Sequence, residues 1–253
     1  MNLEKYVKTP EEIEKMRKAG RAAASVLDYI TPFVQKGIST NALNDLCHTY
    51  ITETLGAIPA PLNYRGFPKS ICTSINHVVC HGIPDDKPLK NGDILNIDIT
   101  VILDGYHGDT SRMFQIGQVA PHAKRLCEIS RECLNIGIEM VKPGVSLFEI
   151  GQAIEHHARK NHYASVKDFC GHGIGKDFHE PGFQVLHYAA EEQKEMILLP
   201  GLTFTIEPMI NQGGYAVKVL KDGWTAISKD KTLSAQWEHT VLVTATGVEI
   251  LTT

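Results

Sequence analysis

Two aspartates on neighbouring strand-like segments are the first residues of this 253-residue chain whose spacing could support chemistry. Residues 93–103 alternate apolar and polar side chains, as a strand does, and Asp104-Gly105 then favours a two-residue hairpin turn. In that register Thr100 lies opposite Asp109, and Asp98 is the diagonal neighbour of Asp109 on the same face, roughly 7 Å away between Cβ atoms. Two carboxylates with no lysine or arginine beside them repel each other unless a cation lies between them. Each aspartate alone could be a surface residue, but together they predict a metal site.

Two glutamates lie in further segments of alternating pattern. Residues 202–207 are predicted to form one strand with Glu207 on its polar face, and residues 235–243 are predicted to form another with Glu238 and Thr240 on one side. A glutamate within such an apolar strand is unfavourable unless it has a partner. Because each glutamate alone is also compatible with a surface position, the strand pattern leaves the partner open.

Three histidines lie beside residues that form turns. His172 is in the glycine-rich segment 170–175, whose Gly-x-Gly-x-Gly spacing differs from the Gly-x-Gly-x-x-Gly of a dinucleotide-binding loop. Flanking glycines leave the ring unobstructed, which suits a metal ligand or a catalytic group as well as a simple turn. His81 and His179 could also reach a cleft as neutral imidazoles. The chain has no His-Glu-x-x-His motif, so a thermolysin-like zinc site is excluded, and it has no Gly-x-Ser-x-Gly motif, so a serine nucleophile lacks support.

The elements that must hold these residues are predicted to be pairs of helices followed by strands. A capping box at residues 9–12 begins a helix over about 10–31, and a second helix, capped by the serine or threonine at its start, is expected over 39–55. Helical spacing of apolar residues recurs over 126–140 and 147–160. Strand-like segments follow each pair of helices, so the expected class is α+β.

A short segment between the two helices of each pair is repeated. Lys142-Pro143-Gly144-Val145-Ser146 is similar to Lys36-Gly37-Ile38-Ser39, and aligning Gly37 with Gly144 gives an offset of 107 residues. The repeat suggests a duplication, although two unrelated helix starts fit the same residues equally well. A duplicated chain would form one domain of two lobes whose sheets meet at a pseudo-twofold axis, with a cleft between the lobes and no dividing linker.

Composition and charge limit the class of protein. Hydrophobic residues make up 43% of the chain, and 25 basic against 29 acidic residues give a net charge of −4, so we expect a globular chain without a general affinity for nucleic acid. The charged N-terminal segment lacks the apolar region of a secretory signal, and no window is apolar enough to cross a bilayer, which predicts a cytoplasmic protein. The six cysteines include no Cys-x-x-Cys pair, so reduced, mostly buried thiols are expected.

Several ordered segments resemble the type I methionine aminopeptidases, and the resemblance covers almost the whole chain. The matching segments are 74–84, 96–101, 104–110, 171–175, 204–209 and 236–240. The resemblance implies the duplicated pita-bread fold, a single catalytic domain over 1–253 with pseudo-symmetric halves at about 9–117 and 118–250. The chain has neither an N-terminal zinc-finger segment nor a long helical insertion between Gly175 and Glu207, and in this it is similar to the short, single-domain bacterial form.

The same resemblance implies a centre of two divalent metal ions. The residues that would hold the ions, with Asp109 and Glu238 bridging both, are Asp98, Asp109, His172, Glu207 and Glu238. Four carboxylates against two dications leave the cluster close to neutral, and oxygen-rich ligation with one imidazole favours Mn, Fe or Co over Zn. The residues that resemble an accessory monovalent-cation site of some relatives are Asn76, Val78 and Ser234.

The resemblance further implies removal of an N-terminal methionine that precedes a small second residue. A water or hydroxide bridging the ions would attack the first peptide bond, and Glu207 would transfer the proton. His81 and His179 would hydrogen-bond the substrate amide and the developing oxyanion. Soft and aromatic side chains suit the methionine thioether, and the residues implied are Tyr64, Phe67, Cys72, Phe178 and Trp224.

The expected partners are the N-termini of nascent polypeptides. Contact with the ribosome is expected to be weak or transient because the chain is acidic overall, and a monomer is expected. An X-Pro dipeptidase or X-Pro aminopeptidase is the alternative within the same fold, but such enzymes carry a large additional N-terminal domain. A non-catalytic pita-bread binding module is the alternative from another class, and such modules lose metal ligands, whereas all five are present here.

Overall fold

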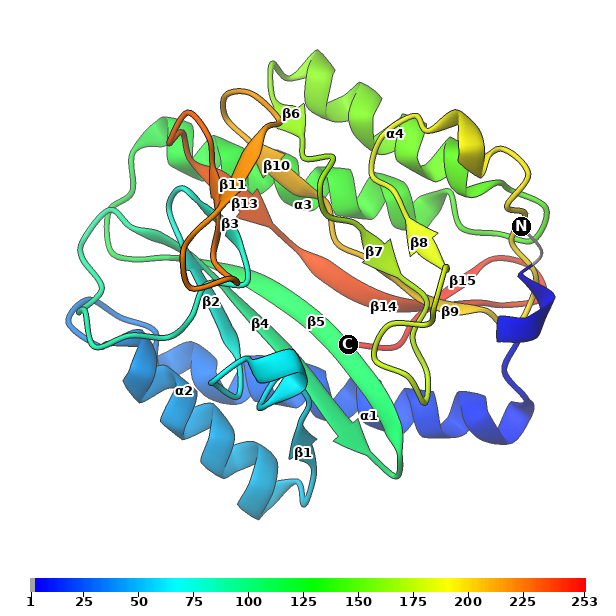
Figure 1. Ribbon diagram of the computed structural model, residues 1–253, viewed down its shortest axis with the longest axis horizontal. Coiled ribbons are helices and arrows are strands. Elements are labelled where there is room, and N and C mark those ends of the chain that lie inside the picture. Colours follow the sequence, from blue (N-terminus) through cyan, green and yellow to red (C-terminus); the bar gives the residue numbers. More distant parts are fainter. Residues whose placement is uncertain (1–2) are drawn as a thin grey trace.

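A long antiparallel sheet forms the centre of the molecule, and helices cover it (Figure 1). The computed structural model describes residues 3–253. The strands of the central sheet, in spatial order, are β1 (Ile58–Pro59), β4 (Ile94–Leu103), β5 (Tyr106–Gln115), β14 (Glu238–Val243) and β15 (Val248–Ile250), with β2 (Cys72–Ile75) paired to β4 and β9 (Thr203–Ile206) paired to β14. The sheet thus joins strands from the first and the second half of the chain.

Within residues 3–253, four α-helices pack against the sheets in two pairs. Their bounds are Pro10–Ile30 for α1, Thr40–Thr49 for α2, Pro121–Glu139 for α3 and Leu147–Lys160 for α4, and short 3-10 turns cover Glu4–Tyr6, Thr31–Phe33, Tyr64–Gly66 and Glu191–Gln193. In Figure 1, α1 and α2 (blue) lie along the lower edge of the view, and α3 and α4 (green) lie along the upper edge. The helix expected over 39–55 begins as predicted, but its last part, Tyr50–Thr54, is π-helical. None of the helices within residues 3–253 is both long and apolar enough to cross a bilayer.

Three smaller sheets complete the fold of the described part of the chain. Their strands are β3 (Val78–Cys80), β12 (Ala226–Ser228) and β11 (Val217–Val219) in the first, β6 (Ala164–Ser165), β10 (Met209–Asn211) and β13 (Ser234–Gln236) in the second, and β7 (Gly171–His172) and β8 (Gln184–Val185) in the third. The single strand predicted over 235–243 is therefore wrong, because the chain changes sheet at Trp237. The Trp237 indole N–H donates to the Cys127 carbonyl of α3 at 3.0 Å, and the strands on its two sides pair with different partners.

The hairpin of β4 and β5 has the predicted register. Thr100 pairs with Asp109, and Asp98 pairs with Ser111. Asp104 and Gly105 have φ angles of 52° and 77°, which match the type I′ turn that favours Asp-Gly. Asp98 and Asp109 therefore project from the same face of the sheet.

The repeated Gly-x-Ser segment makes the same contacts in both halves. In each half the glycine has a positive φ and its N–H donates to a leucine carbonyl, the same leucine donates back to the next residue, and the serine caps the following helix. The bonds are Gly37 to Leu89 (2.9 Å), Leu89 to Ile38 (2.8 Å), Gly144 to Leu198 (3.0 Å) and Leu198 to Val145 (2.8 Å). This equivalence supports the duplication, while the boundaries at 9–117 and 118–250 stay a prediction.

Helix α1 lies unusually close to the strands that it covers. A Cβ atom on Gly20 would lie 2.3 Å from the Leu251 carbonyl oxygen, and one on Gly108 of β5 would lie 2.1 Å from the Ala19 carbonyl oxygen. Glycine at these two positions lets the backbones touch. The six cysteines are free thiols, and five of them are buried, as the sequence predicts.

Candidate metal centre and substrate pocket

One cavity of about 370 Å³ brings the predicted site residues together. It is lined by all five predicted metal ligands, by both predicted substrate-binding histidines and by all five residues of the expected methionine pocket: Asp98, Asp109, His172, Glu207, Glu238, His81, His179, Tyr64, Phe67, Cys72, Phe178 and Trp224. These residues come from both halves of the chain, and the five predicted metal ligands lie on five different strands or directly after them. The cavity therefore lies where the two halves meet.

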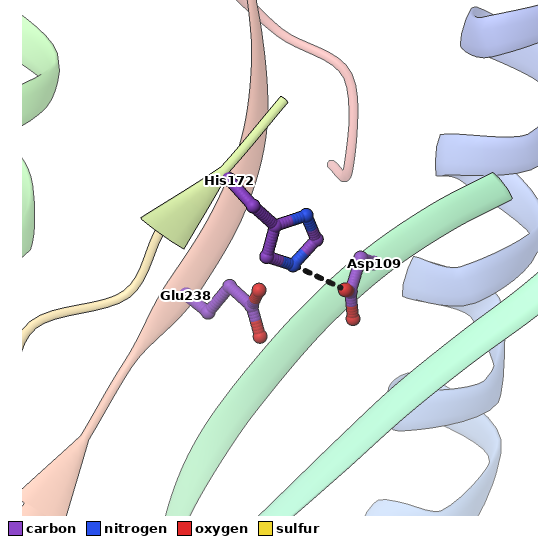
Figure 2. A group of neighbouring side chains, drawn as sticks. All are labelled: Asp109, His172 and Glu238. Carbon is purple, nitrogen blue, oxygen red and sulfur yellow. Dashed lines mark ion pairs between the residues drawn. The ribbon is translucent and has the colours of Figure 1, made fainter. Parts of the chain in front are cut away.

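Regular strands position most of the carboxylates. Asp98 is on β4, Asp109 is on β5, and Glu238 begins β14 opposite Ser111 of β5. His172 lies on the short strand β7, across from these strands. Figure 2 shows the side chains of Asp109, His172 and Glu238 pointing toward one another from three elements. Their potential ligand atoms lie within 4.8 Å of one another.

Glu207 and Asp98 extend this group of acidic side chains. The His172 Nε2 atom lies 3.6 Å from an oxygen of Asp109 and 3.6 Å from an oxygen of Glu207, which directly follows β9. Burial, and then repulsion from neighbouring carboxylates, raises the pKa of Asp98 and of Glu238 well above the usual range. Burial likewise raises the pKa of Glu207, to about 7, although the nearby His172 opposes the rise.

The donor set fits divalent metal ions. Among the described residues that line the cavity, the only lysine or arginine is Arg65, which is exposed. Four carboxylates and one imidazole are thus gathered in a buried site with no buried cation beside them, an arrangement that is unfavourable unless metal ions compensate the charge. Oxygen donors with a single nitrogen suit Mn, Fe or Co, and also admit Zn.

Polar side chains behind the ligands hold them in place. The Thr100 hydroxyl donates to an Asp109 oxygen at 2.8 Å, and the Thr205 hydroxyl donates to Glu207 at 2.8 Å. The Gln236 amide donates to the other Glu207 oxygen at 3.1 Å, and the Glu207 N–H donates to His187 Nε2 at 3.2 Å. Such contacts fix the orientation of metal ligands.

These supporting residues are not among the site residues predicted from the sequence. Alternation along a strand offers a signal for Thr100 and Thr205, since each lies two residues from a ligand on the same strand face. Strand alternation gives no signal for His187 or Gln236, because each meets Glu207 across different elements. Phe169 and Met209 also line the cavity without having been predicted.

The two predicted substrate-binding histidines are held as neutral rings. His179 Nδ1 lies 3.0 Å from the Tyr64 hydroxyl, which can donate to it and leave the proton on Nε2. Desolvation by the cavity walls, followed by the nearby His172 and His81, lowers the pKa of His179 to about 3. Burial lowers the pKa of His81 to about 4. Both rings can therefore donate a hydrogen bond without carrying a charge near neutral pH.

Aromatic rings line the side of the cavity next to the carboxylates. Phe67 and Trp224 pack edge to face with their ring centroids 5.2 Å apart, and Tyr64 and Phe178 lie 5.0 Å apart. Cys72 pairs with Asp98 in the β2–β4 register, and burial raises the pKa of its thiol well above the ordinary value, so this sulfur stays protonated and soft. This wall suits an unbranched thioether side chain.

The residues of the predicted monovalent-cation site lie outside the cavity. The Ser234 N–H donates to the Asn76 carbonyl at 2.8 Å, and Val78 begins β3 two residues further along. The Ser234 hydroxyl is buried without a hydrogen-bond partner among the described residues. The three residues are therefore neighbours, and the bound ion stays a prediction.

Comparison with known proteins identifies the family. Residues 14–245 match the metallopeptidase family M24. The chain belongs to this family. The methionine aminopeptidase of Escherichia coli strain K12 is 55% identical over 247 residues, which cover 97% of this chain and 93% of the relative. The methionine aminopeptidase of Rickettsia prowazekii strain Madrid E is 55% identical over 97% of this chain and 94% of its own length.

Solved structures of M24 proteins share the fold. The crystal structure of methionine aminopeptidase from Rickettsia prowazekii superimposes with a TM-score of 0.94 at 55% identity, over 98% of this chain and 99% of that one. The prolidase from Pyrococcus horikoshii OT3 gives a TM-score of 0.78 at 22% identity, and here 98% of this chain covers only 63% of the longer prolidase. The α+β class, the pita-bread fold and the resemblance to the methionine aminopeptidases are confirmed, and so is the class of metallopeptidase.

Proposed function

We propose that this M24 metallopeptidase removes the N-terminal methionine from nascent proteins and peptides whose second residue is small. The observation that carries the proposal is one cavity in which a buried five-donor metal centre adjoins an aromatic and thiol-lined wall. The relatives of 55% identity that bear the name methionine aminopeptidase support the same substrate.

The five donors would hold two divalent ions, with Asp109 and Glu238 between them. Bound divalent ions supply Lewis acidity, which makes water a nucleophile near neutral pH and polarises a peptide carbonyl. Asp109 suits a shared position because His172 lies 3.6 Å away on one side and Glu238 is part of the same group. Thr100 fixes the Asp109 carboxylate from behind at 2.8 Å.

The other polar residues of the cavity act on the substrate. His179 is assigned to the scissile carbonyl, since Tyr64 holds its Nδ1 and leaves Nε2–H free to donate. His81 is assigned to the substrate amide. Glu207, whose two oxygens accept from Thr205 and Gln236, is assigned to the proton transfer from the attacking water to the leaving amine.

The wall of the cavity sets the choice of first residue. The methionine side chain would lie between Phe67, Trp224 and the Cys72 thiol, where its sulfur meets polarisable and aromatic atoms. The metal centre closes the other side, so the amine of the terminal residue would lie at the ions. An amine held there would explain removal of the terminal residue alone.

Nascent polypeptide N-termini are the proposed substrates, and we propose that the protein acts as a cytoplasmic monomer. Contact with the ribosome is proposed to be weak or transient, since the net charge of −4 allows only a local attraction to RNA. Mn, Fe or Co is proposed as the metal in preference to Zn, and Asn76, Val78 and Ser234 are proposed to hold a monovalent cation.

The substrate is tested with a small panel of peptides on protein loaded with Mn²⁺. We expect cleavage of Met-Ala-Ser, much slower cleavage of Met-Leu-Ser and Leu-Ala-Ser, and no cleavage of Ala-Pro. Faster cleavage of Ala-Pro than of Met-Ala-Ser would favour the X-Pro peptidase alternative. Binding of Mn²⁺ without turnover of any peptide would instead favour a binding module and contradict the proposal.

A further inference from the structure

His179 lies on a segment without regular secondary structure. The chain between β7 and β8 (residues 173–183) contains neither helix nor strand, although the proposed function requires His179 to stay within reach of the substrate carbonyl. In the cavity its ring contacts other side chains of the site, with Tyr64 at 3.0 Å and the rings of His172 and Phe178 at centroid distances of 4.1 and 4.3 Å. Backbone hydrogen bonds to Phe183, Thr203 and His107 hold residues 173–175 at the start of this segment. A fixed point next to His179 itself must come from the side of the segment that faces away from the cavity.

The residue next to His179 supplies that fixed point. Glu180 is largely buried, and its carboxylate accepts from the Lys8 ammonium group at 2.6 Å. The side chains of Lys8 and Glu180 are only 7% and 10% exposed, respectively, so the pair is shielded from water. The Glu180 N–H donates to the Gly173 carbonyl at 2.8 Å, which joins Glu180 to the loop that carries His172.

The N-terminal segment holds Lys8 in turn. The Lys8 N–H donates to the Gly201 carbonyl at 2.9 Å, and its ammonium group also donates to the Tyr6 carbonyl at 2.8 Å. The Tyr6 hydroxyl donates to the Pro181 carbonyl, and the Tyr6 ring packs 5.3 Å from Phe183. The side chains of Tyr6 and Lys8 thus bind the His179 segment, and the backbone of Lys8 binds Gly201, just before β9.

The glycine-rich loop is shaped around this ion pair. A Cβ atom on Gly173 would lie 2.6 Å from one Glu180 oxygen, and a Cβ atom on Gly175 would lie 2.7 Å from Cε of Lys8 and 3.0 Å from the other Glu180 oxygen. Glycine at these positions lets the pair fill the space beneath the loop. Glu180 Oε2 is buried without a hydrogen-bond partner among residues 3–253, and the Lys8 ammonium group, which is bonded to Oε1, is the main compensating charge of this carboxylate.

We propose that Lys8 is a positioning residue, which acts through Glu180 to hold His179 in place for the substrate carbonyl. The inference rests on the proposed function, since it gives Lys8 a part in the same peptide hydrolysis. Lys8 touches neither the cavity nor the metal ligands. Its effect is therefore on geometry, and small displacements of a catalytic group lower turnover strongly.

The kinetic test compares Lys8→Met with Lys176→Met on Mn²⁺-loaded protein. Lys176 is the matched control, because it lies on the same segment as His179 (residues 173–183) but makes an exposed ion pair with Glu12. For Lys8→Met we expect kcat on Met-Ala-Ser to fall about tenfold to a hundredfold, with KM and bound Mn²⁺ within about twofold of wild type. Lys176→Met should match wild type. An unchanged kcat in folded Lys8→Met would overturn the proposal.

A second variant covers the case in which Lys8→Met fails to fold. Lys8→Met combined with Glu180→Gln removes the Lys8–Glu180 ion pair without leaving a lone buried charge, and we expect the same loss of kcat. A double variant with the kcat of wild type would overturn the proposal as firmly. Tyr6→Phe, which removes only the hydrogen bond to Pro181, should lower kcat about two- to fivefold.

A spectroscopic measurement separates this inference from the proposed function. Histidine side-chain NMR signals of metal-free protein, with His179 assigned by its loss in His179→Ala, should show a shifted or broadened His179 signal in Lys8→Met and an unchanged one in Lys176→Met. Identical His179 signals in all variants would overturn the positioning role even if turnover falls. A wild-type protein that does not cleave Met-Ala-Ser would contradict the proposed function. The NMR result would still show whether Lys8 holds His179 in position through Glu180.

Discussion

Replacing Glu207 with glutamine should abolish activity and yet stabilise the metal-free protein. Glu207 is only 13% exposed and lies among three other carboxylates, so its ionised form is unfavourable when no metal is bound. A glutamine has the same shape and no charge. It can still accept from Thr205. If the Gln236 side-chain amide, which now donates to Glu207 at 3.1 Å, turns over, the new amide N–H can donate to Gln236 Oε1, which is buried without a partner among the described residues.

The size of this effect follows from the pKa of Glu207. Burial raises this pKa from 4.5 to about 7, and each pKa unit corresponds to about 1.4 kcal/mol. The folded state therefore binds a proton that the unfolded state has lost, and the free energy of unfolding falls as pH rises from 4.5 to about 7. At pH 8 Glu207→Gln should be more stable than wild type by ~3 kcal/mol, which is about 6–12 °C in Tm for a chain of this size.

The assay is urea unfolding of chelator-treated protein at several pH values. Neutral, buried His81 and His187 have pKa values lowered to about 4 and about 3 by burial, so they destabilise every variant equally as pH falls below about 6.5. The difference between variant and wild type reports the loss of the Glu207 charge, including the effect of that charge on the pKa values of Asp98 and Glu238. It should approach zero near pH 4, and the exposed control Glu53→Gln should differ from wild type by less than about 0.5 kcal/mol. A Glu207→Gln protein less stable than wild type at pH 8 would refute the reasoning.

Three other predictions concern the centre, the oxyanion and the packing of α1. Asp98→Asn and His172→Ala should each abolish cleavage of Met-Ala-Ser while the far-UV circular dichroism stays unchanged; full turnover in either variant would contradict a dinuclear centre. His179→Ala should lower kcat far more than it raises KM, because His179 serves the transition state; steady-state kinetics with an unchanged kcat would reject that role. Gly20→Ala should destabilise the protein by about 1–3 kcal/mol despite the helix preference of alanine, because the new Cβ would lie 2.3 Å from the Leu251 carbonyl oxygen. Chemical unfolding measures the difference, with Gly247→Ala as the control because its Cβ would meet nothing within 4 Å. A Gly20→Ala protein more stable than wild type would show that α1 can move away from Leu251.

Local signals in the sequence predict the helices and the central hairpin well. The Thr9 capping box and the Ser146 N-cap begin helices where predicted, because a cap satisfies backbone groups within one turn. Asp104-Gly105 fixes the β4–β5 register through its turn type. These features depend on residues close together in the chain.

Features that depend on distant residues could not be predicted from periodicity. The strand over 235–243 divides at Trp237 because its indole reaches α3, and nothing within the strand itself indicates this contact. The burial of Lys8 against Glu180, 172 residues away in sequence, is equally invisible in a local pattern, since lysine usually lies on the surface. The convergence of the five donors followed from a resemblance to a family, whereas strand alternation alone suggested only the Asp98 and Asp109 pair.

The central claim is that buried carboxylates and one imidazole from both halves of the chain hold divalent ions for peptide hydrolysis. The most direct test titrates chelator-treated protein with Mn²⁺ while both bound metal and cleavage of Met-Ala-Ser are measured. We predict no turnover without metal, turnover restored in step with binding of up to two ions per chain, and neither binding nor turnover at the same Mn²⁺ concentration in Asp109→Asn. Full turnover by metal-free protein, or unchanged Mn²⁺ binding in Asp109→Asn, would contradict the claim.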